Sequence, residues 1–543
     1  MELSEREKSM LFWASFASLT AAGVGFVLRS LGGNTFWGAH FEISDAQVGA
    51  LFGAGLWPIA ITMILFSLLV DKIGYKVSMF FAFALQGLGA ILTIYAGSFE
   101  IMMAACLVSG LGHGVVEAVI NPLCASIYRT EKSKMLNILH ASWPAGIVIG
   151  GIVWLTIFKG GKDMDWAGAA PAFWFMFIPV IFYGIMFLMC KKFPVDERVE
   201  NDVPMSEMLK EFGGLGAFIA ITFICYELIN QLVGYKVISG NNFEGSLIFW
   251  PKQLEICLIL GIIGGAVFGS AVKSKGKWMF FVLCLVMIPL ATAEIATDGW
   301  IQALMRPTMG EAAGWALVFS ASIMMILRFF AGIPLKYMSP PGLLLLSSVF
   351  SIIGLFTLAG ISGPLVWVAF IFYAVGQTFY WPTVLGFVSE QFPKGGAITL
   401  NTVSAMGLLT VGIFGFQFLG SAKDAATVKF TQEKQSELVV QMQKNEATFK
   451  NKKGEDQKII NKGNFFGVPY PTINVEEFKK KLPTEEAKTE LQAHLDENVG
   501  RSVLRRAALL PTIMSIVFLL IIIYYKSIGG YKPVDLSKLR KEE

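Results

Sequence analysis

Charged residues are scarce in this chain. Asp, Glu, Lys and Arg make up 15% of its 543 residues, and histidine occurs four times, whereas soluble domains carry about 25% charged residues. This scarcity excludes an ordinary soluble domain. In place of charge the chain has 54% hydrophobic residues, 13% aromatics and 55 glycines, which is typical of packed transmembrane helices. The composition predicts an all-α polytopic membrane protein, and the net charge of +4 gives no reason to expect a nucleic-acid partner.

Cysteines and catalytic motifs are also few. The six cysteines lie inside or at the edges of apolar runs, so neither a disulfide framework nor a zinc site is expected. The sequence contains no Walker loop, no paired metal-ligand motif and no nucleophile elbow. We therefore predict that the protein is not an enzyme and needs no cofactor or metal. The chain has no Asn-x-Ser/Thr glycosylation acceptor, which favours a bacterial inner membrane.

Long apolar runs dominate the rest of the chain. Runs of about 18 or more apolar residues predict transmembrane helices. Fourteen such runs span residues 10–31, 47–70, 77–97, 101–127, 138–158, 170–191, 213–235, 254–272, 278–297, 313–334, 342–361, 364–388, 398–420 and 507–527. The first run is too long for the core of a cleaved signal peptide. Lys and Arg gather in the short loops after the even-numbered runs, so the positive-inside rule places both termini in the cytoplasm.

The two ends of the chain repeat each other at a spacing of 264 residues. The shift aligns Gly112 with Gly376, Leu136 with Leu400, Asn137 with Asn401 and Lys72 with Lys336. Parallel six-plus-six repeats are a known transporter architecture. We therefore expect six-helix bundles at 1–192 and 274–543, separated by residues 193–273, which form a cytoplasmic linker and two inserted helices. Residues 421–506 are expected to be a long loop inserted on the outer face.

A carboxylate lies at predicted lipid depth in the fourth run. His113, Glu117 and Asn121 are four residues apart and therefore share one helical face. A charge at bilayer depth costs roughly 2.5–3.5 kcal/mol on insertion scales and normally faces a bundle interior or a wet cavity. We interpret Glu117 as a proton carrier, with a structural ion pair as the alternative. Glu294, in the ninth run, is the best acid of the second half and a candidate coupling partner.

Other polar and aromatic residues in the runs are candidates for binding a solute. A sugar needs hydrogen-bonding groups and an aromatic surface to stack on. The first half offers Asn137, His140 and Trp143 on one broad face of the fifth run, and the second half offers Gln377, Tyr380 and Trp381. Gln86 is a weaker candidate. Packing between helices explains such residues equally well, and it is the more common role of an aromatic stripe.

Two arginines also lie within apolar runs. Arg29 is near the outer end of the first run, where its side chain can reach the membrane surface. Arg328 lies about two turns inside the tenth run. It could pair with an acid, bind an anionic substrate or reach the surface, and the sequence leaves all three open. If both arginines face the cavity, a carboxylate or phosphate substrate is favoured over a neutral sugar.

The loop after the second run resembles the signature loop of the major facilitator superfamily. It reads Asp71-Lys72-Ile73-Gly74-Tyr75-Lys76. The resemblance implies two six-helix bundles, here in a fourteen-helix layout. We expect Asp71, Lys72, Gly74 and Lys76 to act in gating, because a short charged loop can cap helices and pair across two halves in one conformation only.

The fourth run is similar to that of the fucose–proton symporter family. The match comprises Gly112-x-Gly114-x-x-Glu117-x-x-x-Asn121-Pro122, followed by Leu136-Asn137. In that family the glutamate belongs to the sugar and proton site, which the resemblance transfers to Glu117 with Asn121 one turn on. The family's first helix also carries an aspartate, whereas the first run here contains Arg29 and no acid.

Together these features predict a proton-coupled symporter that moves a small polar solute by alternating access, with a monosaccharide as the expected solute. An organic-anion symporter and a drug–proton antiporter are the alternatives within this class, and sodium is the alternative coupling ion. A solute sensor built like a transporter is the alternative from another class. We expect a monomer whose other partner is the lipid bilayer.

Overall fold

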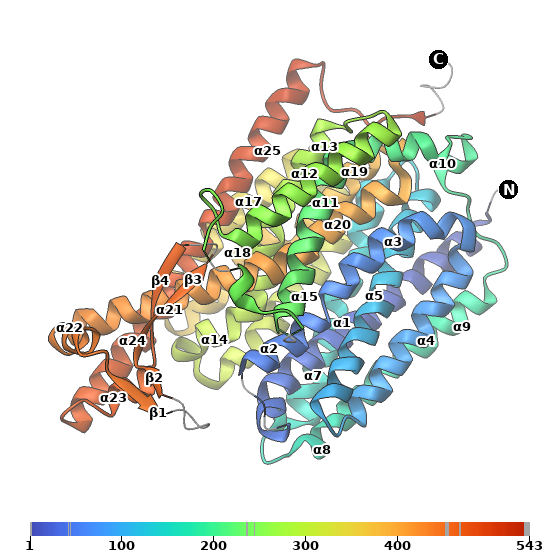
Figure 1. The fold of residues 1–543 in the computed structure, drawn as a ribbon. Coiled ribbons are helices and arrows are strands. Elements are labelled where there is room, and N and C mark those ends of the chain that lie inside the picture. The colour runs from blue at the N-terminus through green and yellow to red at the C-terminus, as the bar shows by residue number, and fades with distance from the viewer. Residues whose placement is uncertain are drawn as a thin grey trace.

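The structure is a computed structural model, and it describes residues 3–536 apart from 42, 44, 235–236, 244, 451–455 and 466–467. The described chain is mostly helical, as the composition predicts (Figure 1). The first half contains α1 (Glu5–His40), α2 (Asp45–Ala54), α3 (Trp57–Ile73), α4 (Tyr75–Ile94), α5 (Phe99–Ile127), α6 (Lys132–His140), α7 (Ser142–Ile152), α8 (Trp166–Ala169) and α9 (Phe177–Met189).

A linker helix and an inserted pair separate the two halves. They are α10 (Glu197–Glu200), α11 (Met205–Gly234) and α12 (Lys252–Val272). The second half contains α13 (Trp278–Ala291), α14 (Thr297–Met309), α15 (Ala313–Phe329), α16 (Gly332–Tyr337), α17 (Pro340–Gly360), α18 (Val366–Thr378), α19 (Tyr380–Gln391), α20 (Gly396–Thr410), α21 (Phe416–Lys434), α22 (Ser436–Lys444), α23 (Val475–Lys479), α24 (Glu485–Ala507) and α25 (Leu509–Ser527). Turns of π-helix occupy Val153–Ile157, Thr292–Ala296 and Val411–Gly415.

Thirteen helical segments of the described residues are long and apolar enough to cross a membrane. One of them, Trp278–Phe329, has 52 residues. At about 1.5 Å per residue it is more than twice as long as the ~30 Å hydrocarbon core is thick. It is broken at Gly310, whose φ of 59° ends α14, and α14 packs against α15 beyond the break. This segment therefore supplies two crossings, and each of the fourteen predicted runs has a counterpart.

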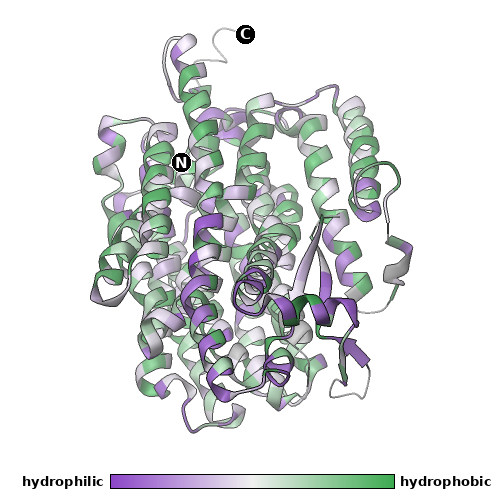
Figure 2. Cartoon of the chain, turned by 90° about the vertical axis from the view of Figure 1, so that its left-hand side faces the viewer, coloured by the Kyte–Doolittle hydropathy of each residue, from purple (hydrophilic) through white to green (hydrophobic). Residues whose placement is uncertain are grey.

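Residues 421–506, the predicted insertion, contain helices and strands that form a folded module. The helix α21 continues to Lys434, and α24 leads directly into α25. Between them lie two antiparallel hairpins, β1 (Thr448–Lys450) with β2 (Asp456–Lys458) and β3 (Ile460–Phe465) with β4 (Val468–Ile473). The module has its own apolar core around Phe478, separate from the core of the bundle. Its surface is more hydrophilic than that of the neighbouring helices (Figure 2).

The module and the two chain ends lie at opposite ends of the bundle. In Figure 1 the module extends to the lower left, whereas the N- and C-termini lie at the upper right. We call the end with the termini the terminal face. The opposite end, with the module, is the module face.

Prolines interrupt two of the helices that carry predicted site residues. α6 and α7 are separate at Ala141, just before Pro144, and α18 and α19 are separate at Phe379, just before Pro382. Proline has no N–H, so the carbonyl four residues earlier loses its helical partner. The carbonyls affected are those of His140 and Thr378. In a membrane such groups must find another donor.

Candidate functional site

Glu117 is buried on α5 and is held by its neighbours one turn away on each side. Its side chain is 6% exposed. Glu117 Oε2 accepts a hydrogen bond of 2.7 Å from Asn121 Nδ2, and Oε1 lies 3.7 Å from His113 Nε2. The predicted common face of these three residues is therefore present. The spacing of four residues brings them together because the helix is regular at this point.

The first half extends this polar group to α6 and α7. His140 Nε2 lies 2.9 Å from Asn121 Oδ1, so Glu117, Asn121 and His140 form a connected chain. The ring of Trp143 stacks on the ring of His113 at a centroid distance of 5.2 Å, with 20° between the planes. Asn137, in contrast, donates a bond of 3.1 Å to Thr383 Oγ1 in the second half. His113, His140 and Trp143 therefore gather around Glu117, whereas Asn137 lies at the contact between the halves.

Arg328 joins the two halves through three bonds. Its side chain is 1% exposed, and Nη2 forms an ion pair of 2.9 Å with Glu294 Oε1. Nη1 donates to the carbonyl of His140 at 2.8 Å, and Nε donates to the carbonyl of Thr378 at 2.6 Å. These are the two carbonyls that Pro144 and Pro382 leave without a helical partner. The side chain thus pairs with an acid, which is one of the three roles left open by the sequence.

The result is one polar chain that crosses the interface. It runs from Glu117 through Asn121 and the ring of His140, and from the His140 carbonyl through Arg328 to Glu294. Glu294 lies in the π-turn Thr292–Ala296. Short π-helical turns inside α-helices are frequent at functional sites. The two acids predicted for coupling are therefore linked, although 177 positions separate them in the sequence.

A small cavity lies between the halves beside this chain. Its walls include Phe26, Ser30 and Trp143 from the first half, and Glu294, Asp298 and Met324 from the second. Its volume is about 20 Å³, which suffices for a single water molecule, since one water needs about 10–15 Å³. This cavity is therefore too small for a solute larger than a water molecule.

Asp298 is a cavity residue that the sequence analysis did not single out. Its Oδ1 accepts a hydrogen bond of 2.7 Å from the Tyr373 hydroxyl on α18. It follows Glu294 by four residues, so the spacing that identified the Glu117 face was present here too. Tyr373 is fully buried and could not be paired with Asp298 from the sequence.

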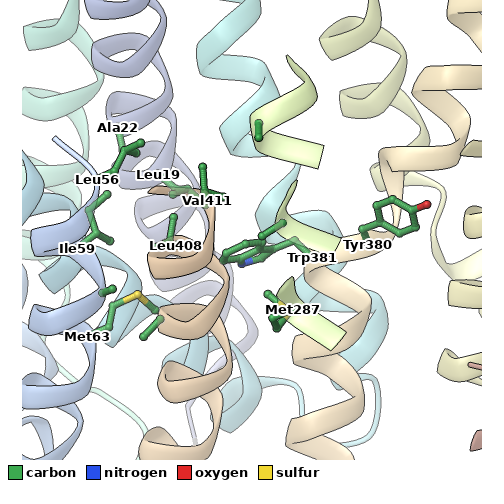
Figure 3. Packing of buried hydrophobic residues seen from close by; sticks show 14 of the residues in the cluster. Leu19, Ala22, Leu56, Ile59, Met63, Met287, Tyr380, Trp381, Leu408 and Val411 are labelled. Carbon is green, nitrogen blue, oxygen red and sulfur yellow. The ribbon is translucent and has the colours of Figure 1, made fainter. Parts of the chain in front are cut away.

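Four further predicted solute-binding residues, Gln86, Gln377, Tyr380 and Trp381, lie apart from the cavity between the halves. Gln86 on α4 accepts a bond of 2.9 Å from the Tyr183 hydroxyl on α9, and Gln377 donates 2.6 Å to the carbonyl of Ala293. Figure 3 shows Tyr380 and Trp381 pointing in opposite directions, with Trp381 directed toward Met287 and Leu408. The predicted polar-aromatic face of the second half is therefore divided among different neighbours.

Arg29 is also engaged away from the cavity. Its guanidinium donates to Ser109 on α5 and lies 5.9 Å from the centre of the Phe173 ring. Neither Arg29 nor Arg328 is among the cavity residues, and the charge of Arg328 is paired with Glu294. The arrangement therefore provides no arginine for an anionic solute in this conformation.

The contact between the halves continues from the site toward the terminal face. Asn401, which the 264-residue repeat aligns with Asn137, donates 2.9 Å to Ser67 Oγ and 3.1 Å to the carbonyl of Ala118. Pro122 deprives this Ala118 carbonyl of its helical partner. Each half thus sends one asparagine of the repeat into the other half.

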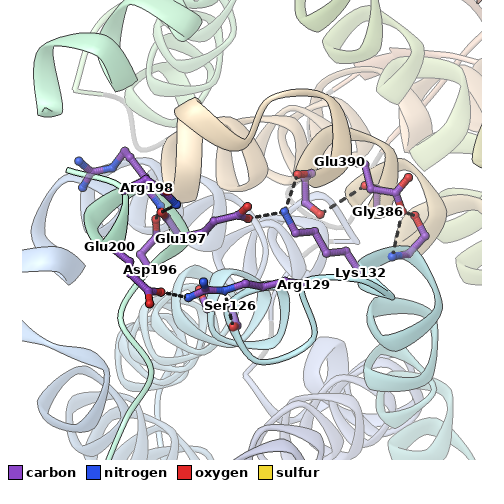
Figure 4. Close-up of polar contacts among 12 residues, drawn as sticks. Ser126, Arg129, Lys132, Asp196, Glu197, Arg198, Glu200, Gly386 and Glu390 are labelled. Atoms are coloured by element: carbon purple, nitrogen blue, oxygen red, sulfur yellow. Dashed lines mark hydrogen bonds and ion pairs between the residues drawn. The ribbon is translucent and has the colours of Figure 1, made fainter. Parts of the chain in front are cut away.

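A group of charged residues closes the terminal face (Figure 4). Lys132 forms an ion pair of 2.5 Å with Glu197 and donates to the carbonyl of Ser389 in the second half at 3.3 Å. Ser133 donates to Glu390 through both its backbone N–H and its hydroxyl. These five residues hold α6 against α19 and the linker at this end of the bundle.

The C-terminal segment takes part in the same closure. The Tyr531 hydroxyl donates 2.6 Å to Glu390 Oε2, while Ser133 occupies Oε1. Burial and the adjacent Glu390 carboxylate raise the pKa of Tyr531, so its hydroxyl keeps the proton that it donates. The backbone N–H of Val534 also donates to the Glu390 carbonyl, at 2.8 Å. Glu390 is therefore shared between the first half and the C-terminal segment.

The predicted gating loop behaves differently from this closure. Gly74 has a φ of 84° and links α3 to α4. Lys76 donates to the carbonyls of Leu188 and Cys190, which end α9 in its own half, and Lys72 is exposed. The side chain of Asp71 lies outside the described part of the chain. The hydrogen bonds of Lys76 therefore stay within the first half, whereas Lys132, Ser133 and Glu390 form contacts between the halves.

A sequence profile of the Major Facilitator Superfamily matches residues 10–420, which is more than half of the chain. The chain belongs to the major facilitator superfamily. The resemblance noted in the sequence is thereby confirmed. Membership in this superfamily points to a transporter and not to an enzyme.

Similar sequences and folds agree with this membership. The synaptic vesicular amine transporter of Rattus norvegicus is 21% identical over 290 residues, which is 52% of this chain and 54% of the relative. The minor myo-inositol transporter IolF of Bacillus subtilis is 22% identical over 139 residues, or 25% of this chain and 31% of that protein. The chain thus spans about half the length of the amine transporters that it matches.

Solved structures resemble the fold at low sequence identity. The proton:xylose symporter XylE is 14% identical with a TM-score of 0.55, covering 79% of this chain and 91% of that one. The transporter FucP in its outward conformation is 14% identical with a TM-score of 0.52, covering 77% and 92%. A bacterial homologue of the human lysosomal transporter Spinster, at 12% identity, covers 95% and 97% with a TM-score of 0.54. At these identities the likeness establishes the fold.

Replacing Arg328 with Met is expected to destabilise the protein strongly. It leaves the Glu294 carboxylate buried and unpaired, which typically costs about 3–5 kcal/mol. It also removes the hydrogen-bond donor to the carbonyls of His140 and Thr378. Thermal unfolding of the purified protein would measure the effect. Arg129→Met is the matched control, because Arg129 pairs with the half-exposed Glu200 and such a surface pair contributes about 0–1 kcal/mol. Equal melting temperatures for the two variants would contradict the assigned role.

Replacing Glu390 with Ala is expected to open the terminal face. The variant loses the bonds from Ser133 and Tyr531, and bonds to a charged group contribute about 1.5–3 kcal/mol each. In a background without native cysteines, a Ser30→Cys reporter in the cavity should react at least tenfold faster with a membrane-impermeant maleimide from that face. Glu200→Ala is the control, since Glu200 pairs with Arg129 within the first half and linker. An unchanged labelling rate in Glu390→Ala would refute the closure.

Proposed function

We propose that the chain is a proton-coupled secondary transporter that moves a small polar solute by alternating access between its two halves. The observation that carries the proposal is the polar chain from Glu117 to Glu294. It links an acid of each half through two hydrogen-bonded segments that meet at His140, whose ring bonds Asn121 and whose carbonyl bonds Arg328. A change in the charge of Glu117 alters the same network that holds the halves together, and this is the linkage that coupled transport requires.

Glu117 acts as the proton carrier in this scheme. His113 and Asn121 contact its two carboxylate oxygens, so they stabilise its charged form, while its burial favours the neutral form. His140 connects the carboxylate to the interface through Asn121. Exchange of the proton changes the balance between these effects and therefore the strength of the contacts that reach Arg328. Glu294, as the partner of Arg328, is the coupling acid of the second half.

A monosaccharide is the solute that we propose first. The cavity combines the Trp143 ring, against which a sugar ring can stack, with the carboxylates of Glu294 and Asp298, which accept hydrogen bonds from hydroxyl groups. His113 stacks on the Trp143 ring and is connected through Glu117 to Asn121 and His140. The present volume is too small for a sugar, so binding would require the halves to separate. A domain division at 1–192, 193–273 and 274–543 is consistent with such a movement.

A protonated amine is the second candidate. Two carboxylates and two aromatic rings line the cavity, and within the described residues its walls contain no basic side chain. An ammonium group is attracted both by carboxylates and by the faces of aromatic rings. The partial similarity to vesicular amine transporters also favours this class. An organic anion is disfavoured, because the Arg328 charge is already paired.

The membrane arrangement follows from the charge distribution. We propose that the terminal face is cytoplasmic, because its short loops hold Lys132, Lys134, Lys273, Lys275 and Lys277. The module would then lie on the outer side of a bacterial inner membrane. A solute sensor remains the alternative of another class, and it would bind solute in liposomes without moving it.

Replacing Glu117 with Gln is expected to abolish uphill uptake while solute exchange continues. Glutamine keeps the size of the side chain and can hydrogen-bond, but it cannot carry a proton. Proteoliposomes with an inward proton gradient and labelled solute would measure both activities. Glu100→Gln is the control, because Glu100 lies on the exposed first turn of the same helix. Unchanged proton-driven accumulation in Glu117→Gln would refute the assignment.

Replacing Asp298 with Asn separates the two solute classes. If the solute is an amine, loss of this charge should weaken binding at least tenfold, since its partner is a cation. If the solute is a monosaccharide, the amide still hydrogen-bonds and the loss should be severalfold at most. Thermal-shift titrations of the purified protein with panels of hexoses and primary amines would detect binding. Stabilisation by organic acids alone would contradict both candidates.

A further inference from the structure

The inserted helices α11 and α12 form a tightly packed hairpin at the edge of the bundle. A Cβ placed on Gly265 would lie 2.7 Å from the Gly214 carbonyl oxygen, and one placed on Gly261 would lie 2.9 Å from the Phe218 carbonyl oxygen. The glycines of α12 are thus explained by close approach to α11. Because glycine has no side chain, these positions leave space beside the two helices toward the terminal face.

A groove of about 700 Å³ lies along this part of the hairpin. Its walls are largely apolar and include Leu215 and Phe218 from α11 and Ala266 from α12. On the outward surface of α12, Ile262, Ile263 and Val267 are 55–65% exposed. In a membrane this surface faces the hydrocarbon. The groove therefore opens toward lipid and offers an acyl chain apolar walls.

One end of the groove is basic and rigid. Lys273 and Lys275 line it, in the turn that follows α12. The backbone N–H groups of Gly214 and Leu215 donate to the carbonyls of Ser274 and Lys275, at 3.0 and 2.9 Å, which fixes the turn to α11 just after the kink at Gly213. Lys277 lies 3.6 Å from Glu211. Among the described residues, neither Lys273 nor Lys275 forms an ion pair. Their charges are therefore available to a ligand.

We propose that this groove is a binding site for an anionic phospholipid, with an acyl chain in the apolar part and the phosphate at Lys273 and Lys275. The occupant is defined by the charge at one end and by the lipid-facing apolar walls at the other. Basic pockets between transmembrane helices on the cytoplasmic side bind anionic head groups in this way. The site is independent of the solute pathway, because none of its residues belongs to the cavity between the halves.

The test compares the retention of phosphatidylglycerol with that of phosphatidylcholine carrying identical chains. The full-length protein is purified from vesicles that contain both lipids in equal amounts, and bound lipids are counted by native mass spectrometry. We expect phosphatidylglycerol to be enriched. In the Lys273→Gln/Lys275→Gln variant, the enrichment should fall by about tenfold or more. Lys277→Gln is the control in the same turn, and it should retain the enrichment.

A second variant tests the groove itself. Ala266→Trp fills the apolar part but leaves both lysines in place, so it should also reduce the retained phosphatidylglycerol. Equal retention of the two lipids by the unmodified protein would overturn the proposal. So would enrichment that persists in the double lysine variant, which would place the lipid elsewhere, or enrichment that persists in Ala266→Trp, which would show attraction without a groove.

Discussion

The two halves are held together at membrane depth by carbonyl groups that prolines have released. Pro144 and Pro382 remove the helical partners of the His140 and Thr378 carbonyls, and Arg328 donates to both. An unpaired carbonyl in a membrane costs several kcal/mol, and an arginine without an acid is also costly. Glu294 provides that acid. Each group would be unstable alone, and the arrangement is stable because all of them meet in one place.

The same principle recurs nearer the terminal face. Pro122 releases the Ala118 carbonyl, and Asn401 of the other half donates to it. Contacts of this kind differ from apolar packing in an important respect. A released carbonyl has no alternative donor in its own helix, so separation of the halves leaves it unpaired unless water enters. Under the proposed alternating access, these contacts would favour the closed state until water reaches the interface, and opening would be coupled to hydration.

Much of the fold and part of the site could be predicted from the sequence. The fourteen runs were recognisable because apolar length is dictated by the bilayer, and the His113, Glu117 and Asn121 face was recognisable because helical spacing is local. The pairing of Arg328 with Glu294 joins different helices, so no local spacing indicated it. Asp298 was accessible to the spacing argument, but its partner Tyr373 was not. The contact of Glu390 with Ser133 and Tyr531 depends on how three distant segments pack, so the sequence did not indicate it. The sequence motif predicted gating at a different loop, Asp71–Lys76.

A proline leaves the carbonyl four residues earlier without its helical partner, and this effect can be read from the sequence. Pro144, Pro382 and Pro122 thus identify the carbonyls of His140, Thr378 and Ala118 as groups that need another donor. The sequence cannot say which side chains supply the donors. The predicted polar face of the second half was dispersed for a related reason, since adjacent residues on either side of the break at Phe379 no longer follow one helical period.

The π-turn at Thr292–Ala296 has a further geometric consequence. Such a turn accommodates one more residue than an α-helical turn, and each residue of an α-helix advances by about 100° around the axis. If this turn became α-helical, α14 would rotate by about that angle relative to α13. Asp298 would then swing away from the cavity and from Tyr373, while Ala291 before the turn kept its place. The one extra residue in the π-turn thus determines whether Asp298 faces the cavity, because it sets the rotation of α14 about its own axis.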